Sequence, residues 1–305
     1  MRGLNPHSTL FAILLFNVIC FDSTADGATI LFSDSFDRPD NRDIDAVTTG
    51  ITNNTGTTFG ASAVYTSPWV DPATDAPDFG APDAIAANGG GQQINDNELQ
   101  LKYGVGTANL FVNHNFTNAS ILSAGGFSVS LDVLGYNESG GGQGAAIAVG
   151  MSQSEAAGAA DALSGATRMT GAFGTTIGNA VPTQSIADFW LAIRGNSSLV
   201  WGGDTGNILG VTGLAAKTGT ISATFSVTDF NAGSLVGYEV FYNGVSQGVG
   251  TFLWSGTNEN YIGLDGRDNT VVRVDNFSVT IPEPTTAGMI AFAIACVVSW
   301  RRRMS

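Results

Sequence analysis

The segment Thr220-Ile221-Ser222-Ala223-Thr224-Phe225-Ser226-Val227-Thr228 decides the fold class. Its apolar side chains occupy every second position, with serine or threonine between them. Successive side chains of a strand point to opposite faces of a sheet, so this alternation predicts a β-strand with one buried and one exposed face. Residues 127–133 repeat the pattern, with Phe, Val, Leu and Val at the odd positions. Two such strands indicate a sheet that covers a hydrophobic core.

Short strands of this kind continue through the chain to residue 280. The continuous apolar run 145–151 is typical of a strand covered on both faces, and Asn243-Gly244 between two apolar segments is a strong hairpin signal. Residues 48–60 are rich in threonine, asparagine and glycine, which predicts a loop. No sustained helical periodicity interrupts the series. About ten short strands with polar turns predict an all-β fold, an antiparallel two-sheet sandwich.

The N-terminal segment has the composition of a signal peptide. Arg2 precedes the apolar run 10–21, and the small residues Ser23-Thr24-Ala25 follow it at the position of a cleavage site. We therefore expect residues 1–25 to form a signal helix that is removed by signal peptidase.

The C-terminal segment has three parts in a fixed order. Pro282-Glu283-Pro284 comes first, an uncharged apolar run over 285–300 follows, and Arg301, Arg302 and Arg303 come last. Two prolines exclude regular structure at the tripeptide. The apolar run is close to the lower limit of about 17 residues for a transmembrane helix. The arginines are expected on the cytoplasmic side of the membrane, and a plain anchor helix is the alternative interpretation.

This three-part ending resembles the PEP-CTERM sorting signal of Gram-negative bacterial envelope proteins. The resemblance implies that an exosortase, a membrane cysteine transpeptidase, recognises and cuts near Pro282, Glu283 and Pro284. It also implies transient anchoring in the inner membrane and delivery to the cell surface or extracellular matrix, with exopolysaccharide as an expected partner. The chain then divides into a signal peptide (1–25), a β-sandwich domain (26–280) and a sorting signal (281–305).

The charge balance excludes one class of partner. Removing two acidic and four basic residues with the end segments changes the formal charge from −14 to −16. Such a surface repels nucleic acid, so nucleic-acid binding is set aside. Both cysteines, Cys20 and Cys296, lie in the end segments, so the remaining domain contains no disulfide.

Two further stretches carry a resemblance for the domain itself. The opening Phe32-Ser33-Asp34-Ser35-Phe36-Asp37-Arg38 and the closing stretches 260–264 and 272–279 resemble the ends of concanavalin A-like, laminin-G-type jelly rolls. The resemblance covers roughly residues 30–280. It implies that the first and last strands lie side by side, which would bring Asp34 near Asp275. A structural calcium ion held by Asp34 and Asp275 is one interpretation of the acidic turn, and a solvated acidic loop is the other.

Most enzyme classes are not supported by the residues present. The exported part has one histidine, His114, and no glycine-rich phosphate loop with lysine. The Glu-x-Asp-x-x-Glu pattern of laminarinase-type sandwiches is absent, and Asp132 is a lone carboxylate in mid-strand. A glycoside hydrolase would need a second carboxylate beside it, so that function is the least favoured of the alternatives.

Carbohydrate binding without catalysis is the other function to weigh. Sugar sites use exposed aromatic rings, and Trp69, Trp201 and Trp254 lie in or beside loops. The alternative is that these rings fill the core. The sequence therefore predicts a non-enzymatic, exported surface protein associated with exopolysaccharide, with a lectin-like module as the alternative and no cofactor other than the candidate calcium.

Overall fold

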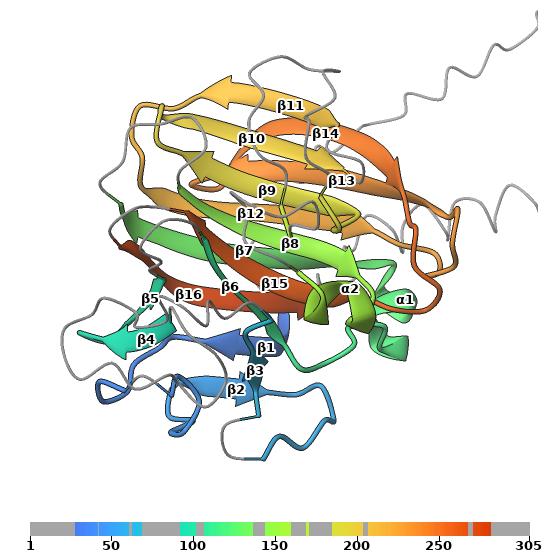
Figure 1. The fold of residues 1–305 in the computed structure, drawn as a ribbon. Coiled ribbons are helices and arrows are strands. Elements are labelled where there is room, and N and C mark those ends of the chain that lie inside the picture. The colour runs from blue at the N-terminus through green and yellow to red at the C-terminus, as the bar shows by residue number, and fades with distance from the viewer. Residues whose placement is uncertain are drawn as a thin grey trace, which may run out of the picture.

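The computed structural model describes residues 28–41, 43–60, 63–68, 92–101, 107–136, 144–159, 169–170, 185–203, 207–267 and 271–281. In these ranges the chain forms two antiparallel β-sheets packed face to face, with two short helices at their margins (Figure 1). The predicted all-β two-sheet sandwich is confirmed. The expected signal and transmembrane helices fall outside the described residues, and none of the helices within them is long and apolar enough to cross a bilayer.

The first sheet has the strand order β14-β13-β12-β7-β16-β1-β2, with β5 pairing to β16 and β4 pairing to β5. Its strands are β1 (Thr29–Asp34), β2 (Ile51–Asn53), β4 (Gln92–Asn95), β5 (Glu98–Leu101), β7 (Gly126–Gly135), β12 (Gly219–Ser226), β13 (Leu235–Tyr242), β14 (Val245–Leu253) and β16 (Val272–Ile281). We call it sheet A.

The second sheet, sheet B, has the order β11-β10-β9-β8-β15-β6-β3. Its strands are β3 (Tyr65–Thr66), β6 (Thr107–Val112), β8 (Gly144–Met151), β9 (Phe189–Arg194), β10 (Ser198–Gly203), β11 (Ile208–Gly213) and β15 (Tyr261–Arg267). The helices are α1 (Ala119–Ala124) and α2 (Gln153–Ala157). A capping box starts α2, because Ser152 accepts from the backbone N–H of Glu155 and the Glu155 carboxylate accepts from the backbone N–H of Ser152.

The core lies between the two sheets and is rich in aromatic rings. Phe225 of β12 lies 4.9 Å from Phe127 of β7 and 5.1 Å from Phe189 of β9, measured between ring centroids. Ile221 and Ala223 are also buried, so the alternation in this strand predicted its buried face correctly. The predicted strand 145–151 is buried at every position of β8, as expected for a strand covered on both faces.

The last strand lies inside sheet A. β16 pairs with β1 on one side and with β7 on the other, and its register joins Thr29 to Ile281 and Asp34 to Phe277. The expectation that the first and last strands are neighbours is confirmed. A bulge between Asp275 and Ser278 interrupts the pairing with β7, and Asn276 there has a positive φ of 48°.

Candidate functional site

Two of the tryptophans predicted to stack on sugars are buried. Trp201 of β10 is 5 % exposed, and its indole N–H donates to the hydroxyl of Tyr238 at 3.3 Å. Trp254, just after β14, is 1 % exposed and donates to the carbonyl of Glu259 at 3.2 Å. A buried ring offers no face to a ligand, so at these two positions the alternative interpretation, a ring that fills the core, is the correct one. Trp69 lies outside the described residues, as do Pro282, Glu283, Pro284 and the three C-terminal arginines.

The carboxylate of Asp34 is occupied by the protein itself. One oxygen accepts from the backbone N–H of Phe36 and from Arg38 at 2.6 Å, and the other accepts from Arg38 and from the hydroxyl of Tyr65, each at 2.9 Å. Both side chains of the Asp34–Arg38 pair are fully buried. Because Arg38 already balances the charge and these donors use the carboxylate's lone pairs, Asp34 does not fit a calcium ligand.

The other half of the predicted calcium staple lies on the outer face of sheet A. Asp275 is the register partner of Asp132, and the side-chain amide of Asn276 donates to both, at 3.0 Å to Asp132 and 3.3 Å to Asp275. The described residues contain no cluster of three or more His, Cys, Asp or Glu side chains arranged for a metal ion. The prediction of a calcium ion held between Asp34 and Asp275 is therefore wrong, because hydrogen bonds within the protein hold both side chains.

The pairing of Asp132 with Asp275 was not predicted, because Asp132 is a lone carboxylate within its own strand. Burial, together with the nearby carboxylates of Asp37, Asp132 and Asp34, raises the pKa of Asp275 to about 6, although the backbone N–H of Asn276 opposes them. A pocket of about 270 Å³ lies beside Asp132. Asp275 is not among the described residues that line this pocket, so the two carboxylates do not face one substrate space as a glycosidase pair would.

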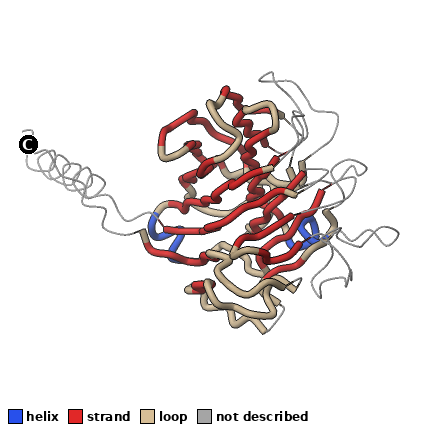
Figure 2. The backbone as a smooth tube through the Cα atoms, turned by 90° about the vertical axis from the view of Figure 1, so that its left-hand side faces the viewer, coloured by secondary structure: helices blue, strands red, loops and turns tan. Residues whose placement is uncertain are grey.

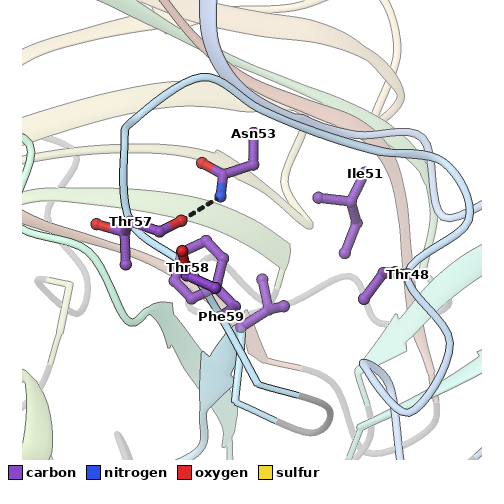
Figure 3. A pocket seen from close by; sticks show the side chains of 7 residues that line it. Thr48, Ile51, Asn53, Thr57, Thr58 and Phe59 are labelled. Carbon is purple, nitrogen blue, oxygen red and sulfur yellow. Dashed lines mark hydrogen bonds between the residues drawn. The ribbon is translucent and has the colours of Figure 1, made fainter.

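A different pocket, which we call the β2 pocket, lies beside β2 and the loop that follows it. It measures about 320 Å³. The loops on either side of β2 lie at the bottom of Figure 1, and Figure 2 draws loops in tan at the same end of the molecule. The described residues that line it are Thr48, Ile51, Asn53, Thr57, Thr58, Phe59 and Val64 (Figure 3). None of these is charged, so the pocket offers hydroxyl and amide groups with one aromatic ring.

The wall of the β2 pocket is held by a short chain of hydrogen bonds. The Asn53 side chain donates to the carbonyl of Thr57 at 2.7 Å, the bond drawn in Figure 3, and accepts from the backbone N–H and the hydroxyl of Thr55. The hydroxyl of Thr55 in turn accepts from the backbone N–H of Thr57 at 3.1 Å. Asn, Thr and Gly favour such side-chain-to-backbone turns, which explains why this sequence folds into a fixed loop.

His114 anchors this loop to sheet B. Its Nε2 lies 3.0 Å from the side-chain oxygen of Asn118, whose amide nitrogen donates to the carbonyl of Thr55, so Nε2 must carry a proton. Nδ1 then accepts from the hydroxyl of Thr57 at 2.6 Å. Burial lowers the pKa of His114, while the Asn118 oxygen opposes that shift. The histidine is therefore neutral at pH 7 and has a positioning role.

Phe59 supplies the only aromatic ring among the described residues of the pocket. It is partly exposed and meets Phe32 of β1 edge to face, with ring centroids 6.4 Å apart and an interplanar angle of 82°. This contact fixes one edge of the ring against the core and leaves part of its surface available to a ligand. The sequence indicated only a loop here, because the residues that form the pocket are held by long-range contacts with Phe32 of β1 and with Asn113 and His114, just after β6.

Comparisons with known proteins give a limited result. No protein-family model matches the sequence, and no curated protein is similar to it. Among solved structures, the carbohydrate recognition domain of Emp46p in its potassium-bound form is 7 % identical, with a TM-score of 0.37, and the match covers 62 % of this chain and 85 % of that chain.

Two further structures are similar at the same level. The exoplasmic/lumenal domain of VIP36, in its Ca²⁺/Man3GlcNAc-bound form, is 6 % identical with a TM-score of 0.39 and coverage of 63 % and 81 %. A legume lectin-like domain from Entamoeba histolytica is 10 % identical with a TM-score of 0.37 and coverage of 63 % and 87 %. Likeness at this level establishes neither a family nor a function.

Proposed function

We propose that this protein is a non-enzymatic, exported protein of the cell surface that binds exopolysaccharide through the β2 pocket. The observation that carries the proposal is the set of groups lining the pocket, where threonine hydroxyls and an asparagine amide surround a partly exposed phenylalanine ring. Sugars present hydroxyl groups on their edges and C–H groups on their faces, and these match the two kinds of lining.

The size and charge of the β2 pocket support the same assignment. Its volume of about 320 Å³ falls at the lower end of the range for small-molecule sites, roughly 300 to 1,000 Å³. The described lining contains no cation to hold a phosphate or carboxylate, so a neutral sugar unit fits better than an anionic one. The sandwich would then be a concanavalin A-like jelly roll with a lectin-like role.

The test of binding uses the full chain on a glycan array, with calcium and with a chelator, followed by titration of each glycan that binds. Replacing Phe59 by alanine should weaken binding at least tenfold, because it removes the stacking surface. Leu134→Ala is the matched control, since it truncates an apolar residue beside the second pocket. Loss of binding in L134A but not in F59A would place the sugar elsewhere, and absence of any binding would overturn the proposal.

Export and sorting rest on the two end segments and are proposed on their resemblance alone. Pro282, Glu283 and Pro284 would be the recognition site of an exosortase, followed by the apolar segment 285–300 and the arginine-rich end. In a Gram-negative host that carries an exosortase, replacing these three residues by alanine should leave the chain uncut and in the membrane fraction. Normal processing of that variant would contradict the sorting role without affecting the sugar-binding proposal.

A further inference from the structure

Strand β14 forms one edge of sheet A. It pairs with β13 on one side, and within the described ranges no strand pairs with its other side. An edge strand presents unpaired N–H and C=O groups, and proteins usually protect such edges with charged residues or proline. β14 has neither, because Val245–Leu253 reads VSQGVGTFL. The edge is chemically ready to accept another strand.

Large apolar side chains on this edge point away from the core. Val249 is 71 % exposed and Leu253 is 60 % exposed on β14, and Leu235, the register partner of Leu253 on β13, is 61 % exposed. These fractions are the highest among the large apolar residues of the described chain, together with that of Val245 at the hairpin end. A cluster of this kind on a sheet edge marks an interaction surface.

The inner face of β14 is held against the core. Gly248 packs against the ring of Trp201, Gly250 packs against Tyr238, and Phe252 is 8 % exposed. The bulge in the β13–β14 pairing falls between Ser246 and Gly248, so residues 248–253 form a regular strand. A second strand can therefore pair with a straight and firmly supported edge.

We propose that β14 is a homodimer interface, in which two copies of the chain pair antiparallel about Thr251. Val249 and Leu253 are each two residues from Thr251. Antiparallel pairing about that residue places Val249 of one copy beside Leu253 of the other, and the reverse. A two-fold interface requires a surface that complements itself, and this spacing provides one. The two A sheets then become one continuous sheet.

Charge does not oppose this arrangement, although the chain carries a formal charge of −14. Within β13 and β14, the one charged residue is Glu239, the register partner of Val249. From strand rise and spacing, the two Glu239 side chains would lie about 20 Å apart across the axis. That separation exceeds the Debye length of about 8 Å at physiological salt, so their repulsion is screened.

The first test fixes the register by crosslinking. The full chain with Cys20→Ser and Cys296→Ser provides a cysteine-free background for a single new thiol. Residues opposite each other across an antiparallel pair have Cα atoms about 4.5 to 5.5 Å apart, which suits a disulfide. Thr251→Cys should therefore form a covalent dimer under mild oxidation, and Ser246→Cys on the bulged end of the same strand should not. Equal crosslinking of the two variants would overturn the proposed register.

The second test measures association by sedimentation equilibrium. Val249→Lys places a charge beside Leu253 of the other copy, within the paired segment, and should weaken dimerisation at least tenfold. Ser246→Lys adds the same charge to the same strand outside the paired segment, so its dimerisation constant should equal that of the unmodified chain. Every variant keeps the end segments, so association through those segments is common to all. Equal association of V249K and S246K, or a monomeric parent chain, would refute the interface.

This interface is independent of the proposed sugar site. β14 and β2 lie at opposite edges of sheet A, so the β2 pocket is at the far side of each copy. Failure of the glycan experiment would leave the crosslinking and sedimentation results unchanged.

Discussion

At the scale of single residues, the buried side chain of Asp34 gives a prediction about stability. Its carboxylate is fully buried and is paired with the buried guanidinium of Arg38. Removing one partner of a buried ion pair leaves the other charge without compensation, at a cost of about 3 to 5 kcal/mol. We expect Asp34→Ala to lower the free energy of unfolding by that amount in urea titrations.

The control for this substitution is three residues away. Asp37 is exposed, so Asp37→Ala should change the free energy of unfolding by less than about 0.5 kcal/mol. If D34A were no less stable than D37A, Asp34 would have no structural role of the kind described here.

Asp275 gives a prediction about pH. Its pKa is about 6 in the folded protein, above the ordinary value of 3.8, so the folded state favours the protonated form. Its stabilising contribution is therefore present below pH 4 and is lost as the pH rises through 6. Asp275→Asn, which cannot ionise, should raise the urea midpoint relative to the parent chain at pH 7.5 and give no such gain at pH 4.

Asp229 provides a control, because its pKa is shifted in the opposite direction to that of Asp275. The hydroxyl of Ser234 and the backbone N–H of Asn231 donate to its carboxylate and lower its pKa. Its contribution is present at neutral pH and is lost as the pH falls. Asp229→Asn should lower the urea midpoint at pH 7.5, and a gain there would contradict the assignment of both shifts.

Some residues could not be placed from the sequence alone. Trp201 lies between two glycines distant in sequence, and a Cβ at Gly210 would approach its ring to 1.9 Å and one at Gly248 to 2.6 Å. No local pattern distinguishes such a ring from an exposed one. The partner of Asp34 was similarly hidden, because Arg38 follows it by four residues in a turn where periodicity carries no information.

At the scale of elements, the alternating strands were predictable and their partners were not. Period-two patterns gave the buried faces of β7 and β12, and Asn243-Gly244 gave the β13–β14 hairpin. β2 has three residues and lies within the predicted loop 48–60, and β3 has two residues and was not predicted. The β2 pocket depends on these short elements, so it was not predictable either.

The hairpin between β13 and β14 depends on backbone conformation. Asn243 and Gly244 have φ angles of 48° and 74°, the left-handed pair that a two-residue turn requires. Gly244→Ala should cost about 1 to 2 kcal/mol of unfolding free energy, because a Cβ is disfavoured at that φ. Gly213→Ala is the matched control, since Gly213 has no positive φ and open space around it. Equal effects of the two substitutions in thermal unfolding would refute this explanation.

At the scale of the whole molecule, the position of β16 determines which truncations are tolerated. β16 pairs with β1, β5 and β7, so its removal separates the β1–β2 pair and the β4–β5 pair from the rest of sheet A. A chain that ends after Ile281 should keep a single cooperative unfolding transition, monitored by near-ultraviolet circular dichroism. A chain that ends at residue 270 should show none, and cooperative unfolding of that shorter chain would contradict the central role of β16.

The central position of β16 also determines when sheet A can form during synthesis. Until Ile281 has been synthesised, β1 lacks the strand that connects it to β7, although β1 was made more than two hundred residues earlier. At about 5 to 20 residues per second, that interval lasts roughly 10 to 50 s. During synthesis, sheet A therefore stays divided, with β1 and β2 separate from β7, until β16 has been made.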